Sequence, residues 1–212
     1  MLVLFVHGMG RTPISATPML WRLRRHGHSV DVVGYFTGTE TFTEIVDRVG
    51  RKIQDIAVKG EYVVVGHSLG GIMLRAALQN MPATTKLPNH LFLLGSPVTP
   101  ARLAQKSQHE LGFQLVSGDC GQLLATPSRL LEIGMPDIPK TAIVGTRSFS
   151  LTKKYFLDEQ NDGVVSVNEC AHKDISEVIK VPIVHTFLPS SRKVSKIILD
   201  KISTIQSALA TL

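Results

Sequence analysis

Residues 63–71 read Val-Val-Val-Gly-His-Ser-Leu-Gly-Gly, and the rest of the chain is arranged around this stretch. Three β-branched residues predict a buried strand, and the G-x-S-x-G pattern after them opens a segment with apolar residues at helical spacing. In such a strand-turn-helix unit Ser68 sits on a sharp turn, and glycines two positions away on each side prevent collisions. The stretch therefore predicts a nucleophile elbow at Ser68, with a glycine-rich structural turn as the alternative.

The segments on either side of the elbow alternate between strand and helix patterns. Apolar runs predict six strands, at residues 2–6, 29–35, 62–65, 90–94, 141–144 and 178–184. Helical spacing predicts helices at 16–26, at 41–57, directly after the elbow, and from Ser190 or Ser191 to 209. Strands that alternate with helices indicate an α/β fold, a doubly wound and mainly parallel sheet in one domain over residues 1–212.

Residues 97–140 depart from this alternation. The segment contains five prolines and several glycines, and helical spacing occurs only in short pieces such as 101–111. A connection of this length is too long to be an ordinary loop. We expect a small cap or lid inserted over the functional site, and a crossover helix with a wandering loop is the alternative.

Composition indicates a globular protein without special partners. The chain has 212 residues, 43% of them hydrophobic, and its net charge of +6 comes from basic residues scattered along the sequence, which favours a solvated surface over a nucleic-acid site. The two cysteines, Cys120 and Cys170, are expected to be buried thiols rather than a disulfide. Without a signal sequence or an apolar run of about 20 residues, we expect a cytoplasmic protein with no integral membrane segment.

An elbow serine needs a base to take its proton and an acid to hold that base in the correct tautomer. In a fold of this kind both follow the elbow, in the order acid then histidine, each after a later strand. Asp162 lies in Asn-Asp-Gly-Val-Val at residues 161–165, after the fifth strand, and His185 directly ends the sixth strand. We therefore predict Asp162 as the acid and His185 as the base, against the alternatives of a turn-stabilising Asp and a core His.

Other acids and histidines fit these positions less well. His172 falls before the last strand among charged residues and is expected at the surface. Asp158 and Glu159 lie close to Asp162 but lack a following turn glycine. The remaining histidines precede the acid in sequence.

Acyl transfer also needs donors for the oxygen that becomes negative in the tetrahedral intermediate. Leu69 N–H, at the start of the elbow helix, is one candidate. The second is Met9 N–H, in the loop after the first strand, where Gly8 lets the backbone turn toward the site. His7 is expected to be a hydrogen-bonding scaffold for this loop rather than a second base.

With these residues assembled, the sequence resembles the α/β-hydrolase family, and within it the bacterial lipase-like and esterase-like members that begin at a His-Gly strand. The motifs that carry the resemblance are His-Gly-Met-Gly at 7–10, Gly-His-Ser-Leu-Gly-Gly at 66–71, Gly-Ser-Pro at 95–97, Asn-Asp-Gly-Val-Val at 161–165 and His-Thr at 185–186. The resemblance implies an α/β-hydrolase sheet that lacks the first two strands of the family. It also implies Ser68 as nucleophile, Asp162 and His185 as its acid and base, and Met9 with Leu69 as the oxyanion hole.

The expected activity is hydrolysis of carboxylic esters through an acyl-enzyme, with no metal and no organic cofactor. The short 97–140 segment, without a long apolar lid helix, favours a small or medium acyl ester or thioester over emulsified triglyceride. Acyl transfer, thioester cleavage or amide cleavage by the same triad remain alternatives, as does a catalytically silent scaffold used for binding. The sequence leaves the oligomeric state open.

Overall fold

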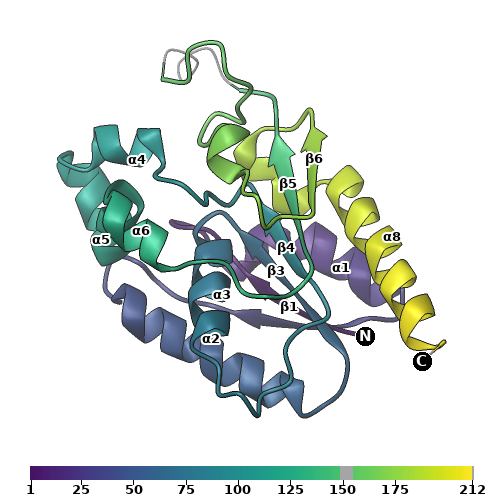
Figure 1. Ribbon diagram of the computed structural model, residues 1–212. Coiled ribbons are helices and arrows are strands. Elements are labelled where there is room, and N and C mark those ends of the chain that lie inside the picture. The colour runs from purple at the N-terminus through teal and green to yellow at the C-terminus, as the bar shows by residue number, and fades with distance from the viewer. Residues whose placement is uncertain (149–154, 212) are drawn as a thin grey trace.

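Six parallel strands form one sheet at the centre of the molecule (Figure 1). The computed structural model describes residues 1–148 and 155–211. In spatial order the sheet runs β2-β1-β3-β4-β5-β6. Its strands are β1 Leu2–Val6, β2 Ser29–Val33, β3 Tyr62–His67, β4 Leu91–Leu94, β5 Lys140–Gly145 and β6 Glu177–Val181. The predicted α/β class, with a doubly wound parallel sheet of six strands, is confirmed.

Helices cover both faces of this sheet (Figure 1). On one face α1 (Thr17–Arg25) and α8 (Arg192–Leu209) pack with the side chains of alternate strand residues such as Phe5 and Phe92. On the other face α2 (Phe42–Ala57) and α3 (Leu69–Gln79) pack with the remaining strand residues. The inner strands β1 and β3 are buried on both sides, which explains why they are nearly continuous apolar runs.

The parallel register brings the carboxyl ends of the strands to one edge of the sheet. Val6 of β1 pairs with Gly66 of β3, and Gly145 of β5 pairs with Val181 of β6. The loops that leave this edge carry the motifs predicted to form the site. Ligands of open parallel sheets bind at this edge, because the loops there are free to vary around a fixed scaffold.

Several strand and helix ends differ from the sequence expectation, such as that of β2, which ends at Val33 rather than at 35. Strand β6 ends at Val181 rather than at 184, since Pro182 has no N–H to continue the ladder. His185 therefore does not end a strand directly: it begins the 3-10 helix η3 (His185–Ser190). Near the N-terminus a 3-10 turn, η1 (Pro13–Ala16), precedes α1, so the helix predicted over 16–26 runs from Thr17 to Arg25 and begins one residue later than expected.

The 97–140 segment is more helical than its glycines and prolines indicated. It forms α4 (Arg102–Ser107), α5 (Leu111–Ala125) and α6 (Pro127–Glu132), so the expectation of only short helical pieces is wrong for α5. Three apolar residues of α5 are largely exposed: Leu111 and Leu115 by about three quarters of their surface and Val116 by about half. The three helices lie together at one side of the molecule, beside α2 and α3 (Figure 1).

A kink at Gly118 divides α5 and fixes it to the rest of the protein. Gly118 has φ 50° and ψ −138°, and a Cβ there would lie 2.4 Å from the Thr37 carbonyl oxygen. Beside the kink, Thr37 Oγ1 donates to the Val116 carbonyl oxygen at 2.6 Å, and Phe42 N donates to Asp119 Oδ2 at 3.0 Å. The left-handed backbone at Gly118 is what lets the 36–42 loop approach α5 this closely.

Buried Arg75 of α3 connects that helix to Pro97, at the start of the 97–140 segment, and to Gly134, near its end. Its side chain donates to the Gly134 carbonyl oxygen from Nε and Nη2, and to the Pro97 carbonyl oxygen from Nη1. Only 2% of this residue is exposed. Removing it would leave the two carbonyl groups without these donors, so Arg75 holds the segment at both ends.

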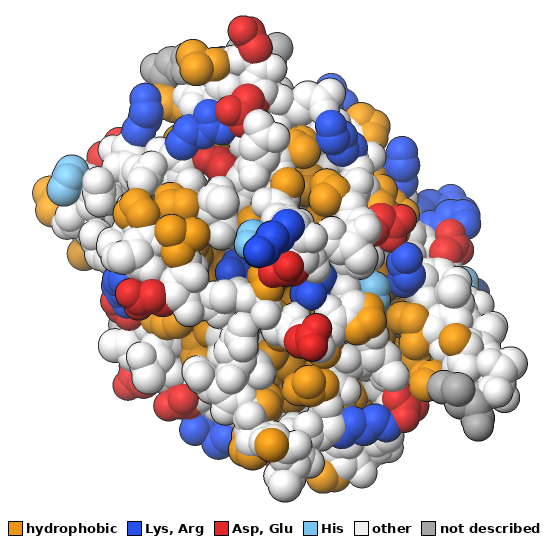
Figure 2. Space-filling view, viewed as in Figure 1, with side chains coloured by type: hydrophobic (Ala, Val, Ile, Leu, Met, Phe, Trp, Pro, Cys, Tyr) orange, Lys and Arg blue, Asp and Glu red, His pale blue; other side chains and the backbone are white. Residues whose placement is uncertain are grey.

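The surface and the cysteines agree with the composition. Lys and Arg side chains lie at many places on the face shown in Figure 2, interleaved with acidic and uncharged side chains. Cys120 and Cys170 are free and buried, which confirms the prediction of two thiols. Within residues 1–148 and 155–211, no helix has the length and apolar character needed to cross a membrane.

Candidate active site

Ser68 occupies the turn between β3 and α3, and its backbone is strained as an elbow requires. Its φ of 52° and ψ of −123° lie in a region that residues with a side chain rarely adopt. The neighbouring glycines have no room for a side chain. A Cβ on Gly66 would meet the backbone of Gly71 at 2.3 Å, and one on Gly70 would meet the Val6 carbonyl oxygen at 2.2 Å. The G-x-S-x-G pattern thus reflects close backbone approach on both sides of Ser68.

Asp162 and His185 are joined by a short hydrogen bond. His185 Nδ1 lies 2.7 Å from Asp162 Oδ2, and both side chains are buried. The other carboxylate oxygen, Oδ1, accepts from Val164 N and Val165 N, while His185 N donates to the Asp162 carbonyl oxygen at 2.9 Å. These bonds fix the carboxylate, so that Nδ1 carries the imidazole proton and Nε2 is left with a lone pair.

His67, the residue before Ser68 in the elbow, contacts His185 of this pair. The rings of His67 and His185 lie 4.8 Å apart, and His67 Nε2 donates to the His185 carbonyl oxygen at 3.1 Å. Burial holds the pKa of His67 well below its ordinary value, and the charges of His185 and Arg11 act in the same direction. Among the described residues no hydrogen bond joins Ser68 Oγ to His185. In unliganded enzymes this bond is often long and closes when substrate binds.

The loop after β1 lies against Ser68. A Cβ on Gly8 would lie 3.1 Å from Ser68 Cβ and 2.9 Å from His67 Nδ1. His7 Nε2 accepts a hydrogen bond from Tyr35 N, so the ring proton of this histidine is on Nδ1. His7 Nδ1 therefore donates to the Gly8 carbonyl oxygen, at 2.8 Å. The ring also stacks on that of Tyr35, with 4.1 Å between the ring centres. In a trans peptide the N–H points opposite to the C=O. Met9 N–H therefore points away from His7, which is hydrogen-bonded on both nitrogens as a scaffold would be.

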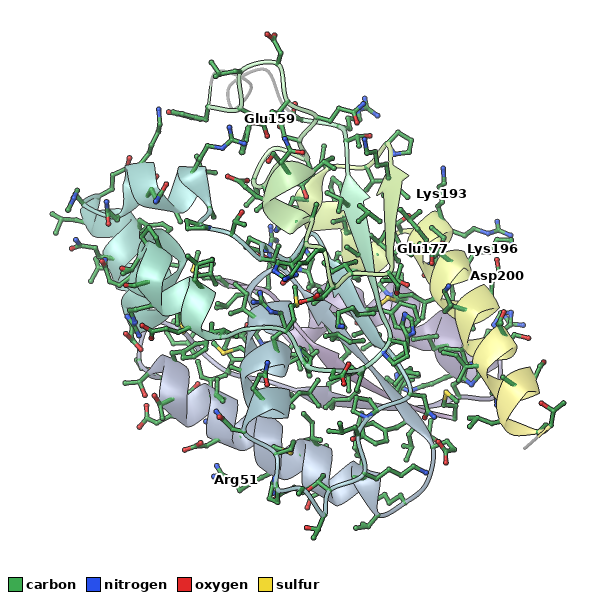
Figure 3. The ribbon with its side chains drawn as sticks, viewed as in Figure 1. Arg51, Glu159, Glu177, Lys193, Lys196 and Asp200 are labelled. Atoms are coloured by element: carbon green, nitrogen blue, oxygen red, sulfur yellow. The ribbon has the colours of Figure 1, made fainter. Side chains whose placement is uncertain are left out.

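The competing acids and histidines are occupied elsewhere. Glu159, on the loop labelled at the top of Figure 3, pairs with Arg102 at the start of α4. The same guanidinium binds buried Glu169 through Nε at 3.0 Å, so Arg102 links the 97–140 segment to the loop that carries Asp162. His172 is half-buried, with Nδ1 3.3 Å from Asp174 Oδ2. In the part of the chain that the structure describes, no cluster of three or more His, Cys, Asp or Glu could hold a metal ion.

Sequence reasoning missed one residue of the site, Arg11. Its Nη2 donates to Thr186 Oγ1 at 3.0 Å, so its side chain bridges from the Met9 loop to the residue that follows His185. Residues 11 and 186 are far apart in sequence, and the only available signal was the position of Arg11 two residues after Met9. Only the folded chain brings this positive charge to the site.

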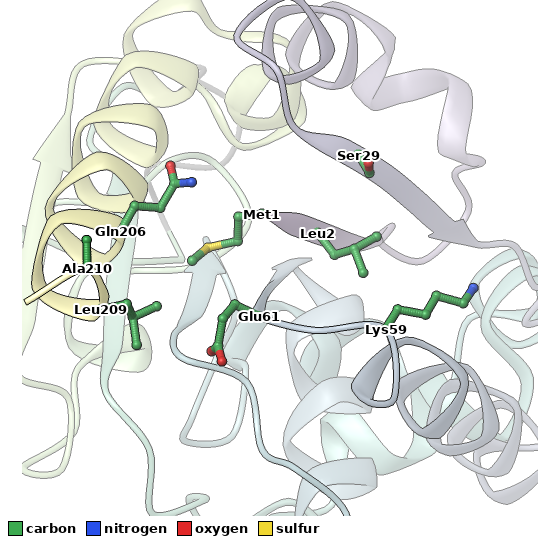
Figure 4. A pocket seen from close by; sticks show the side chains of 8 residues that line it. All are labelled: Met1, Leu2, Ser29, Lys59, Glu61, Gln206, Leu209 and Ala210. Atoms are coloured by element: carbon green, nitrogen blue, oxygen red, sulfur yellow. The ribbon is translucent and has the colours of Figure 1, made fainter. Parts of the chain in front are cut away.

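Two cavities differ in their relation to the site. One of about 630 Å³ lies at the amino ends of β1 and β3, on the edge of the sheet away from Ser68 (Figure 4). Its lining residues are Met1, Leu2, Ser29, Lys59, Glu61, Gln206, Leu209 and Ala210. A smaller one, of about 370 Å³, is lined by Arg147, Pro182, Ile183, Val184 and Phe187, most of which flank His185 in the sequence. Neither cavity is lined by Ser68, Asp162 or His185 itself.

Comparisons with known proteins bear on the family and the fold of the chain. A family model described as the alpha/beta hydrolase family matches residues 3–168. No curated protein sequence matches the chain. Among solved structures, the mature form of lipase BlEst2 from Bacillus licheniformis superposes with a TM-score of 0.76 at 13% identity, over 93% of this chain and 90% of that one.

Two further solved structures share the fold. Tomato methylketone synthase I, complexed with 2-tridecanone, has a TM-score of 0.66 at 11% identity, over 96% of this chain and 98% of that one. Phospholipase PlaB from Legionella pneumophila has a TM-score of 0.65 at 19% identity, over 81% of this chain and 46% of that one. At these identities the likeness is one of fold, and the chemistry has to be argued from the site itself.

Proposed function

The chain belongs to the α/β-hydrolase family, and from that premise we propose that it is a serine hydrolase of carboxylic esters. Ser68 is the nucleophile, His185 the general base and Asp162 the acid that orients it. The observation that carries the proposal is the 2.7 Å contact between Asp162 Oδ2 and His185 Nδ1, buried beside a strained elbow serine. A buried carboxylate on one nitrogen of an imidazole makes the other nitrogen a base for the serine hydroxyl.

The reaction proceeds in two halves. Ser68 Oγ attacks the acyl carbon while His185 Nε2 takes its proton, and the same imidazolium then gives that proton to the departing alcohol. Water next attacks the acyl-enzyme, again losing its proton to His185, and Ser68 is released with the acid product. Asp162 keeps its negative charge throughout and stabilises the imidazolium.

Met9 N–H and Leu69 N–H are the proposed donors to the tetrahedral oxyanion. Leu69 opens α3, where the first N–H groups of a helix lack intrahelical partners. Neither N–H donates a hydrogen bond within the described residues. The bond from His7 to the Gly8 carbonyl supports this assignment, since it orients the Gly8–Met9 peptide in advance.

The substrate is proposed to be a small or medium acyl ester or thioester. The cavity of about 370 Å³ lined by residues that flank His185 in the sequence is the candidate for holding an acyl chain or alcohol of modest size. Residues 97–140 are proposed to act as a cap, because Val116 of α5 lies within 3.6 Å of where a Gly10 Cβ would stand, beside the oxyanion loop. A cytoplasmic location stays a prediction from the sequence.

Covalent labelling tests the proposal. A small fluorophosphonate probe, followed by peptide mapping, is expected to modify Ser68 in the wild type and nothing in Ser68→Ala. Ser203→Ala, which removes an exposed hydroxyl from α8, is the matched control and should label like the wild type. A series of 4-nitrophenyl esters would then define acyl length. Folded wild-type protein that is not labelled would contradict the proposal and favour a silent scaffold.

A further inference from the structure

Arg11 stands at the mouth of the proposed site. It follows the oxyanion-loop residue Met9 by two positions, and its Nη2 donates to the hydroxyl of Thr186, the residue after His185. The side chain therefore crosses from the loop that carries Met9 to the residue after the proposed base.

The charge of Arg11 is not neutralised by the protein. Arg48, Arg102 and Arg129 each form an ion pair with a carboxylate, whereas Arg11 forms none within residues 1–148 and 155–211. The nearest acid of the site, Asp162, is buried and bonded to His185. The residue is exposed, yet its charge still affects buried His67, which precedes Ser68. An arginine in this position attracts an anion from solvent.

The Arg11 side chain keeps most of its hydrogen-bond donors available to bind an anion. A guanidinium has five N–H donors, and the bond to Thr186 uses one of them. That bond also orders a long side chain before substrate arrives, which reduces the entropy lost on binding. Arg147, which is exposed and lines the smaller cavity, adds a second positive charge at this edge of the sheet. It too has no ion pair among the described residues.

We propose that Arg11 is a specificity-determining residue that binds a carboxylate or phosphate group of the substrate, so that the site prefers esters with a negative charge near the scissile bond. This inference rests on the proposed esterase function. An arginine fork pairs with both oxygens of a carboxylate or phosphate, which gives direction as well as charge. The anion could belong to the acyl part or to the alcohol part, and both arrangements bring it to the same guanidinium.

Two matched substrate pairs separate these arrangements. For the acyl part, 4-nitrophenyl hydrogen adipate is compared with its neutral methyl ester, and release of nitrophenolate is followed for both. For the alcohol part, 3-acetoxybenzoate is compared with 3-acetoxybenzamide. The measured quantity is the ratio of kcat/KM for the anionic member to kcat/KM for the neutral member, after the uncatalysed rate is subtracted.

Arg11→Gln is expected to lower this ratio about tenfold in at least one pair. A change of this size is what the loss of one partly exposed hydrogen bond to a charged group produces. Arg11→Lys should keep part of the preference, because it retains the charge but not the fork. Raising the salt concentration should reduce the ratio in the wild type, since an exposed charge is screened. Arg51→Gln removes the same charge from an exposed position of α2, labelled in Figure 3, and should leave the ratio unchanged.

A purely structural role for Arg11 gives a different result. If its only task is to tie the Met9 loop to Thr186, then Arg11→Gln and Thr186→Val would lower kcat for both members of each pair equally, and the ratio would not move. An unchanged ratio in both pairs therefore overturns the inference while ester turnover and Ser68 labelling leave the proposed function standing. Absence of labelling and of any turnover would overturn both.

Discussion

The proposed role of Asp162, to orient His185, can be tested by replacing one carboxylate oxygen with an NH₂ group. In Asp162→Asn the amide oxygen can still accept from Val164 N and Val165 N, so the loop should keep its shape. The NH₂ group, however, would donate to His185 Nδ1 and force the proton onto Nε2, where it blocks the base. We expect kcat on 4-nitrophenyl butyrate to fall about 10³-fold or more. Stopped assays of purified variants would measure this.

The matched control for that prediction is Asp158→Asn, an exposed acid of the same loop. It should retain wild-type kcat, because it lies outside the buried pair. Equal loss in both variants would point to a change in the loop as a whole, and retention of activity in Asp162→Asn would remove Asp162 from the triad.

How far the site could be predicted depends on whether its parts are local. One nine-residue stretch contains both the strained Ser68 and the two glycines, Gly66 and Gly70, that lie close to other backbone. The elbow could therefore be predicted from the sequence. The order of acid and base along the chain indicated Asp162 and His185. The contact of Arg11 with Thr186 joins residues 175 positions apart, and no periodicity or turn signal reports such a pair.

At the scale of elements, α5 depends on the glycine at its kink. Gly118→Ala would place a Cβ 2.4 Å from the Thr37 carbonyl oxygen and would hold a side chain at φ 50°. We expect the free energy of unfolding to fall by about 2 kcal/mol or more, and Tm by about 5 °C. Thermal unfolding followed by circular dichroism would measure the change.

Gly112 provides the control within the same helix. A Cβ at Gly112 meets no atom within 4 Å, and its φ is not positive, so Gly112→Ala should leave Tm unchanged or raise it slightly. If the two alanine variants have the same Tm, the kink does not anchor α5 to the 36–42 loop.

Local patterns placed most elements correctly but not their ends. Alternating and apolar runs predicted all six strands, while the end of β6 was set by Pro182 and by the turn into η3. The residues of α5 were not predicted as one long helix, because the non-helical backbone at Gly118 interrupts it. Tertiary contact with the 36–42 loop, rather than propensity, determines that helix.

At the scale of the whole molecule, buried neutral histidines make stability depend on pH. Burial lowers the pKa of His90 to about 4 in the folded chain, from 6.5 in the unfolded chain, and lowers the pKa of His67 as well. Between pH 6.5 and 4 the unfolded chain therefore binds more protons. The free energy of unfolding should fall as the pH falls through this window, by up to roughly 3 kcal/mol for His90.

Urea unfolding at pH 7.5, 6 and 5 would measure this dependence. His90→Gln should flatten it, since the variant has no imidazole to protonate. His172→Gln, which changes a half-buried histidine near Asp174, is the control and should follow the wild type. A pH dependence in His90→Gln as steep as in the wild type would contradict the prediction.

The cavity in Figure 4 has a practical meaning for how the protein can be handled. Met1 and Leu209 line it together, so both ends of the described chain meet at the edge of the sheet opposite Ser68. A tag, a surface linker or a fused domain joined to either end would leave from that edge. The protein can therefore be immobilised or circularly permuted through its ends while Arg11 and the mouth of the site stay open to solvent.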